Sequence, residues 1–238
     1  MRYLILSDIH GNLEALERIL TEQKTMRVDT IYSLGDIIGY GANPRECLQL
    51  MMRHAQCFIC GNHEYAILSD EYKQGFNPFA YKAIEWTYNQ LKKKDVDFIK
   101  TFSMVHVDND FTLVHGSPQE PETFQYVDDS YDADTAFRSV TTRLCFIGHT
   151  HIPYLFTEGA RRSSYFEEGK FVFDKKKRYI INVGSVGQPR DLDKRLSCAL
   201  FDDDEYTVEI VRIAYDNKKA AGKITQAGLP QVLADRLS

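Results

Sequence analysis

The chain has 238 residues, of which 43% are hydrophobic and 26% charged, and its formal net charge is -5. This length can bury a sizeable core, and we expect residues 1–238 to form a single domain. The mildly acidic balance gives no electrostatic reason to expect a stable complex with nucleic acid.

Two further classes are disfavoured by the sequence. Its apolar runs stay far shorter than the roughly 20 residues of a membrane helix, and the first ends at Asp8, too early for a signal peptide. The five cysteines are an odd number, which argues against a disulfide framework, and we interpret Cys57-x-x-Cys60 as structural. We therefore expect a cytoplasmic protein with no membrane partner.

The first half alternates strands and helices. Apolar runs predict strands at Arg2–Leu6, Thr30–Leu34 and Ala55–Cys60. Apolar residues at helical spacing predict a helix over 13–20, and Pro44 opens a second that continues to about Arg53. The segment from Asn77 to Phe102 is predicted to be helical, with Phe79, Ala83, Trp86 and Leu91 on its buried stripe and Lys92–Lys94 near its C-terminus.

The second half is richer in strands. They are predicted at 102–107, 111–115, 144–147, 154–156, 164–166, 171–173, 179–182, 197–201 and 207–213. Residues 119–131 are expected to form a loop that shapes a substrate pocket, followed by a short helix over 133–140. The charged runs 174–178 and 202–205 are interpreted as solvated hairpin turns, and the last 23 residues as a helix and a tail.

Polar side chains gather where the predicted strands end. Asp36 follows the strand that ends at Leu34, inside the glycine-rich stretch Ser33–Gly41. Similar positions after other strands are occupied by Asp8, His10, Asn62, His63, His115, His149 and His151. Carboxylate, imidazole and amide oxygen together suit borderline divalent metals. These residues are therefore candidate metal ligands rather than isolated structural histidines.

The sequence resembles the calcineurin-like metallophosphoesterases, in their bacterial and archaeal phosphodiesterase-like branch. The resemblance rests on five ordered motifs: Asp8-x-His10, Gly35-Asp36-x-x-Gly39, Gly61-Asn62-His63-Glu64, His115-Gly116 and Gly148-His149-Thr150-His151. It implies an α/β fold, a four-layer αββα sandwich of two mixed sheets flanked by helices. It also implies that Asp8, His10 and His151 hold one metal, that Asn62, His115 and His149 hold a second, and that Asp36 bridges both.

The chemistry of such a site follows from its charges. Two cations about 4 Å apart repel each other, and a carboxylate shared between them reduces that cost. The pair lowers the pKa of a bridging water from 15.7 toward about 7, which supplies hydroxide as the nucleophile. His63 would protonate the leaving alkoxide or stabilise the phosphate oxygens, and Glu64 would orient the His63 imidazole. Mn²⁺ is the expected metal, with Fe, Zn, Ni or Co as alternatives.

The substrate class is less closely defined. Glu64 matches the phosphoprotein phosphatases, but Gly39-Tyr40-Gly41 stands where those enzymes carry a phosphate-clamping arginine. We therefore expect a phosphodiesterase acting on a small soluble ester, such as a nucleotide, with Asn62, His63, Tyr40 and Arg190 near the substrate. The alternatives are a phosphomonoesterase or protein phosphatase, a nucleotide-polyphosphate hydrolase, and, more remotely, a non-catalytic scaffold. The oligomeric state is left open.

Overall fold

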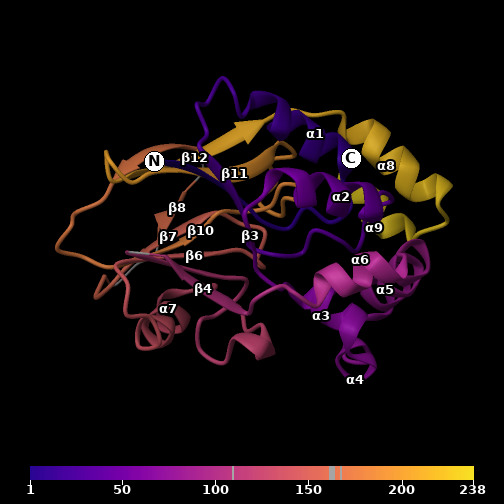
Figure 1. Cartoon of the computed structure of the whole chain (residues 1–238), viewed down its shortest axis with the longest axis horizontal. Helices are drawn as coiled ribbons and strands as arrows, with labels where there is room; N and C mark the ends of the chain where they lie inside the picture. The colour runs from indigo at the N-terminus through magenta and orange to yellow at the C-terminus, as the bar shows by residue number, and fades with distance from the viewer. Residues whose placement is uncertain (109, 161–163, 167) are drawn as a thin grey trace.

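The computed structural model describes residues 1–108, 110–160, 164–166 and 168–238, whose strands form two mixed sheets (Figure 1). The first sheet has the order β3 (Cys57–Phe58), β2 (Thr30–Ser33), β1 (Arg2–Leu6), β11 (Leu196–Asp202), β12 (Thr207–Ile213) and β9 (Gly169–Val172). The second has the order β4 (Val105–Asp108), β5 (Phe111–Val114), β6 (Leu144–Ile147), β10 (Tyr179–Asn182), β7 (Tyr154–Thr157) and β8 (Ser164–Tyr165).

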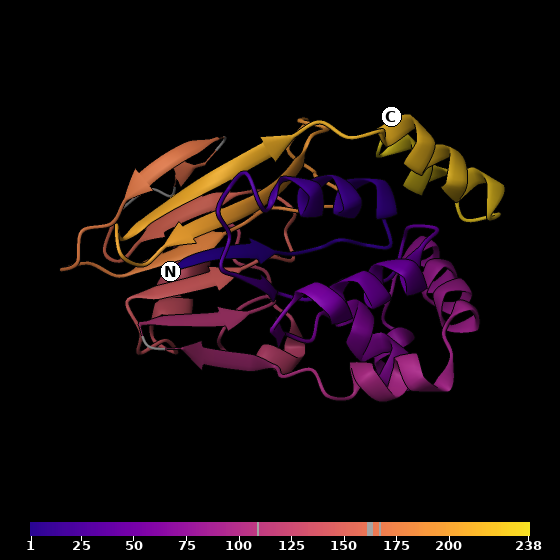
Figure 2. The same ribbon diagram turned by 45° about the horizontal axis from the view of Figure 1, so that its top comes forward.

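The central strands are apolar on both faces because each sheet is covered on both sides. In β1, Tyr3 and Ile5 point into the core between the sheets, whereas Leu4 and Leu6 point toward the outer helices. β6 shows the same alternation, with Phe146 between the sheets and Ile147 under α7. The result is the αββα sandwich that the sequence predicts, and Figure 2 shows the two sheets stacked.

Most helices lie on the outer side of the first sheet and at the end of the sandwich that carries the strand-exit loops (Figure 1). They are α1 (Leu13–Glu22), α2 (Pro44–His54), α3 (Asn62–Leu68), α4 (Asp70–Lys73), α5 (Pro78–Gln90), α6 (Lys93–Ile99), α8 (Asn217–Gln226) and α9 (Gln231–Asp235). α7 (Ser130–Phe137) covers the outer face of the second sheet, and a 3₁₀ turn forms at Pro121–Thr123. Among the described residues, no helix is long and apolar enough to cross a membrane.

Several local predictions need correction. The helical segment 77–102 breaks at Leu91 into α5 and α6, so Lys92–Lys94 begin α6 instead of ending a helix. The buried face of α5 is formed by Ala80, Ala83, Ile84 and Thr87, and Phe79 is 53% exposed. Asn62 opens α3, a helix that is not predicted from the polar cluster at Gly61–Glu64.

One predicted turn and the C-terminal tail also differ from expectation, whereas the charged run 202–205 forms the predicted hairpin turn between β11 and β12. The run Asp174–Arg178 joins β9 of the first sheet to β10 of the second, so it is a crossover and no hairpin. The Arg178 guanidinium donates there to the carbonyls of Phe137 and Val140. Helices α8 and α9 pack together against α5 and the Tyr40 loop, and α8 also contacts α1, so the chain end is an ordered part of the sandwich.

Candidate metal centre

The candidate site lies where parallel strands of both sheets end. β1, β2 and β3 run parallel in the first sheet, and β5, β6 and β10 run parallel in the second. Because their carboxyl ends meet at one end of the sandwich, the loops that follow them converge. These loops carry Asp8, His10, Asp36, Asn62, His63, His115, His149 and His151, and each of these residues is at most 9% exposed.

The backbone of these loops is in an uncommon conformation. Asp8, His10, Asp36, His149 and His151 all have positive φ, between 49° and 69°. A left-handed non-glycine residue costs about 1–3 kcal/mol, and such residues concentrate at functional sites. Backbone hydrogen bonds join the loop that carries Asp8 and His10 to two other segments. The His10 amide donates to the Asp36 carbonyl at 2.8 Å, and the Gly187 amide donates to the Asp8 carbonyl at 2.9 Å.

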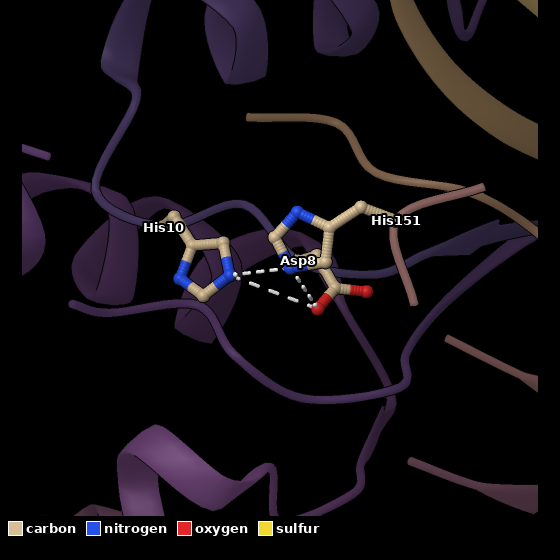
Figure 3. A group of neighbouring side chains, drawn as sticks. All are labelled: Asp8, His10 and His151. Carbon is tan, nitrogen blue, oxygen red and sulfur yellow. Dashed lines mark hydrogen bonds and ion pairs between the residues drawn. The ribbon is translucent and has the colours of Figure 1, made fainter. Parts of the chain in front are cut away.

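The first donor group consists of Asp8, His10 and His151 (Figure 3). The Nε2 atoms of His10 and His151 lie 3.1 Å apart, and Asp8 Oδ1 is 3.2 Å from His151 Nε2 and 3.7 Å from His10 Nε2. The other carboxylate oxygen of Asp8 accepts the His149 amide at 3.0 Å. Asp8 therefore has one oxygen held by the backbone and one directed at the two rings.

Asp36 lies between this group and a second one. Its Oδ1 accepts the His63 amide at 2.9 Å, whereas its Oδ2 is 3.6 Å from His10 Nε2 and 3.4 Å from His115 Nε2. Asp36, His115 and His149 form a second donor cluster, and Asn62 Oδ1 lies 3.2 Å from His115 Nε2. One oxygen of Asp36 thus faces donors of both groups, which is the position that a bridging ligand requires.

Backbone carbonyls orient three of the imidazoles. The Nδ1 atoms of His10, His115 and His151 lie 3.1, 2.8 and 2.6 Å from the carbonyl oxygens of Ile38, Leu34 and Gln188. A carbonyl only accepts, so each Nδ1 must carry a proton, and the Nε2 lone pair of the neutral ring points into the cluster. This is the tautomer in which a histidine binds a metal.

Burial and the two carboxylates perturb the titration of these rings. Burial lowers the pKa of His149 to about 3 and that of His63 to about 4, and it also lowers the pKa values of His10 and His151. Burial acts in the same direction on His115, but the Asp36 and Asp8 carboxylates outweigh it and raise the pKa of that ring to about 9.

The carboxylates respond to the same neighbours. Burial alone would raise the pKa of Asp8 and of Asp36, but the surrounding histidines hold both pKa values below the usual range. Both aspartates are therefore anionic at neutral pH. A divalent cation would compete with the proton for His115 Nε2.

The donor set fits divalent cations. In the neutral tautomers fixed by their Nδ1 contacts, His10 Nε2 faces His151 Nε2, so two acceptor atoms face each other without a donor between them. Asp8 Oδ1 is buried and has no hydrogen-bond partner among the described residues. A cation between these atoms satisfies all of them, and imidazole with carboxylate suits Mn²⁺, Fe²⁺ or Zn²⁺.

The role predicted for Glu64 is wrong. Its carboxylate does not contact the His63 ring but accepts the backbone amides of Asp36, Ile37, Ile38 and Gly61 at 2.7 to 3.2 Å. Burial and the Asp36 charge raise the pKa of Glu64 to about 7. Glu64 therefore ties the Asp36 loop to the start of α3, and it is a positioning residue for Asp36.

The His63 ring stands at the edge of the cluster, with Nε2 4.0 Å from Asp36 Oδ2. Its Nδ1 has no hydrogen-bond partner among the described residues. The ring packs between Tyr40 and Phe76, with centroids 4.4 and 5.2 Å away. Space for it depends on Gly39, where an added Cβ would lie 2.1 Å from His63 Nδ1. The missing side chain at Gly39 therefore makes room for the His63 ring.

Tyr40 and Arg190 lie beside the donors. Tyr40 is 8% exposed and packs on His10 at 4.5 Å between centroids. Arg190 donates to Gln188 Oε1 at 3.1 Å and places its positive charge near the Tyr126 hydroxyl, and its Nε is buried without a hydrogen-bond partner among the described residues. The segment 182–190 packs under the site, where the Ser185 hydroxyl donates to the Asp8 carbonyl at 2.8 Å.

Two neighbours of the site, Tyr126 and Arg236, are not predicted from the sequence. Tyr126 stacks on His149, with ring centroids 4.2 Å apart and an interplanar angle of 12°. Arg236, in the C-terminal segment, donates to the same Gln188 Oε1 as Arg190, at 3.3 Å. Neither residue belongs to a recognisable motif, and only the packing of distant segments brings them to the site.

Comparison with known proteins agrees with this geometry. Residues 1–205 match the family model of the calcineurin-like phosphoesterase superfamily domain. An uncharacterized protein of Methanocaldococcus jannaschii is 39% identical over 98% of this chain and 96% of its own length. The crystal structure of a metallophosphoesterase from Sphaerobacter thermophilus has a TM-score of 0.90 at 40% identity, covering 100% of this chain and 98% of that one.

A hypothetical protein of Pyrococcus horikoshii shares the fold, with a TM-score of 0.81 at 19% identity over 99% of this chain and 97% of its own. The expected family is therefore confirmed, together with its general chemistry, the hydrolysis of phosphate esters with the help of divalent metal ions. The chain belongs to the calcineurin-like phosphoesterase superfamily.

Proposed function

We propose that the protein is a phosphodiesterase that uses two divalent metal ions. The observation that carries this proposal is the position of Asp36 Oδ2, which faces His10 Nε2 on one side and His115 Nε2 on the other. A single carboxylate oxygen between two donor groups is the arrangement that two neighbouring cations need. When bound, the two cations would supply a Lewis acid for the phosphate oxygens and a hydroxide nucleophile at neutral pH.

The donors divide between the two cations. Asp8, His10 and His151 would hold the first, and Asn62, His115 and His149 the second. The chain holds these donors in place before any ion arrives, because one oxygen of each aspartate accepts a backbone amide and three histidines donate from Nδ1 to carbonyls. This explains why the loops tolerate left-handed backbone at five positions.

His63 is proposed to act on the substrate rather than on a cation. Its Nε2 lies 4.0 Å from Asp36 Oδ2 at the edge of the cluster, and we place the leaving group of a bound ester beside it. A phosphate beside the ring would favour the protonated imidazole, which can donate a proton to the departing alkoxide or a hydrogen bond to phosphate. The packing of the ring against Tyr40 and Phe76 limits its orientation.

The two side chains beside the cluster, Tyr40 and Arg190, favour a phosphodiester over a phosphomonoester as the substrate. Tyr40 occupies a place where an arginine would add a bidentate anchor for a dianionic monoester, and a tyrosine offers one neutral hydroxyl. Arg190 supplies one guanidinium, which also donates to Gln188, and we propose that it contacts a non-bridging phosphate oxygen. One such contact suits the single negative charge of a diester. Asn62 would contact the same phosphate.

The test compares two esters after controlled metal loading. Metal-free protein is reconstituted with Mn²⁺, Fe²⁺, Zn²⁺, Ni²⁺ or Co²⁺, and the turnover of bis-p-nitrophenyl phosphate is compared with that of p-nitrophenyl phosphate. We expect activity to depend on added metal, with Mn²⁺ effective and with a higher kcat/KM for the diester. A higher kcat/KM for the monoester would refute the diester preference, and full activity in metal-free protein would refute the mechanism.

Arg190→Ala separates the anchor from the metal centre. We expect it to raise KM while the metal content stays unchanged, because Arg190 is not one of the metal donors. Arg138→Ala, on an exposed residue at the end of α7, is the matched control and leaves KM as it is. An unchanged KM in Arg190→Ala would remove this residue from the substrate site.

A further inference from the structure

A cavity of about 250 Å³ opens directly beside the second donor group. Asn62 and His149, two of the proposed metal donors, form one wall. The other walls include five aromatic side chains, Tyr40, Tyr72, Phe76, Phe124 and Tyr126. We call this cavity the aromatic pocket. An ester with its phosphorus at the metal centre would direct one of its substituents into it.

The rings of the aromatic pocket hold one another in place. Tyr72 packs edge-to-face on Phe76 at 5.8 Å and on Phe124 at 5.6 Å between centroids. Tyr126, from the loop after β5, closes the opposite side by stacking on His149. Tyr126 is 49% exposed, so the wall that it forms can be reached from solvent. Planar faces at fixed positions favour a planar ligand over a flexible alkyl chain.

The charge and the size of the pocket further restrict the class of ligand that it can bind. Its lining contains no Lys, Arg, Asp or Glu among the described residues. A polyphosphate or a phosphopeptide would find no countercharge there. The volume of 250 Å³ lies below the roughly 300–1,000 Å³ typical of pockets for drug-sized ligands, so it accommodates one ring system. A polar group is present, because Asn77 uses its side-chain oxygen to cap α5 and keeps its amide NH₂ as a donor.

We propose that the aromatic pocket binds the base of a nucleoside phosphate ester, stacked against Tyr72 and its neighbours, while the phosphate lies at the metal centre. The proposal rests on the proposed function, since it assigns the substrate class of the same site. It adds a contact for the part of the substrate that does not react. Stacking of one base on an aromatic ring corresponds to an affinity gain of about five- to 150-fold.

The first test measures binding without catalysis. Adenosine, which carries no phosphate, is titrated into the Mn²⁺-loaded protein by isothermal calorimetry. We expect binding at millimolar concentration or tighter, and a loss of about fivefold or more in Tyr72→Leu. Tyr88→Leu, which removes a 54% exposed tyrosine from α5, is the matched control and binds adenosine like the wild type.

A second variant tests the pocket in case Tyr72→Leu does not fold. Asn77→Asp keeps a good N-cap for α5 but removes the amide donor and adds a negative charge at the pocket wall. It is expected to fold normally and to bind adenosine more weakly. The proposal is refuted if the wild type does not bind adenosine, or if Tyr72→Leu and Asn77→Asp both bind it as tightly as Tyr88→Leu does.

The third test uses two esters that share a reacting group. Adenosine 2′,3′-cyclic phosphate and glycerol 1,2-cyclic phosphate are both five-membered cyclic diesters, and the adenosine ester alone carries a base. We expect kcat/KM to be at least about five times higher for the adenosine ester, with the ratio falling toward one in Tyr72→Leu. Equal values in the wild type would refute the pocket and leave the phosphodiesterase intact. If neither ester is cleaved but adenosine binding still depends on Tyr72, the pocket stands and the phosphodiesterase fails.

Discussion

Replacement of Glu64 by glutamine distinguishes a structural role of this residue from a catalytic one. Glu64 Oε2 accepts the Asp36 amide at 2.7 Å and the Gly61 amide at 3.1 Å, and Oε1 accepts the amides of Ile37 and Ile38. A glutamine keeps one acceptor oxygen and places an NH₂ group where the other oxygen was. That group cannot accept, so two hydrogen bonds are lost in a fully buried site.

The expected cost follows from these two bonds. A hydrogen bond to a charged group contributes about 1.5–3 kcal/mol, and the neutral side chain also relieves repulsion with Asp36, so the lower value applies. Two bonds at this value lower the free energy of unfolding by about 3 kcal/mol. For a chain of this size each kcal/mol shifts the Tm by about 2–4 °C, so the Tm of Glu64→Gln should fall by about 6–12 °C.

The assay is thermal unfolding of metal-free protein, followed by circular dichroism. Glu85→Gln is the control, because Glu85 forms a surface ion pair with Lys73 and is 45% exposed at its side chain, and its Tm should stay within about 2 °C. An unchanged Tm in Glu64→Gln together with a fall in kcat would refute the structural role. That result would restore the expectation that Glu64 acts through His63.

Three further substitutions test the metal centre. Asp36→Asn keeps a residue type that tolerates the φ of 52° but loses the bridging charge. We expect metal content, measured by elemental analysis, and activity to fall together. Two ions bound at normal affinity would contradict the bridging role. His63→Ala should reduce kcat by about 10²–10⁴ with both metals retained, and loss of a metal would make His63 a ligand. Gly39→Ala brings a Cβ within 2.1 Å of His63 Nδ1 and should lower kcat without changing the metal content. Gly222→Ala is the control, because its Cβ meets nothing within 4 Å, and it should leave kcat unchanged.

The sequence predicts the central strands of this fold well because they are almost completely buried. Leu144–Ile147, Tyr179–Asn182 and Thr207–Ile213 form strands with the predicted limits, and the first two are buried at every position. Sheet membership is harder to predict, because local turn chemistry cannot tell a hairpin from a crossover. The run Asp174–Arg178 has the composition of a hairpin turn, yet pairing with distant strands separates its two neighbours.

In the candidate site, too, some residues can be predicted from local sequence and others cannot. Short motifs reveal Asp8, Asp36 and His149 because donor type and strand-exit position are both local properties. The function of Glu64 depends on amides from two segments, 36–38 and Gly61, and nothing in the sequence around it indicates these partners. Arg236 reaches Gln188 only because α8 and α9 fold back over the Tyr40 loop.

The helical segments 62–68 and 70–73 are not predicted from the sequence. Both are short, and their sequence mixes motif residues with tyrosines and acids, so helical periodicity has too few turns to appear. They matter for function, since α4 carries Tyr72 and α3 begins at Asn62. Packing, and not intrinsic propensity, holds them: α3 packs against α5 and α6, and α4 packs against α3.

The left-handed backbone at five of the proposed ligands has a consequence for the entropy of metal binding. Aspartate and histidine have only two side-chain torsions each, and here the main chain and its hydrogen bonds already restrict them. Folding, and not ion capture, therefore removes most of the conformational freedom of the donors. Such a rigid cage exchanges one ion for another with little rearrangement of the chain. The occupying metal would then be decided mainly by which ions the surroundings supply.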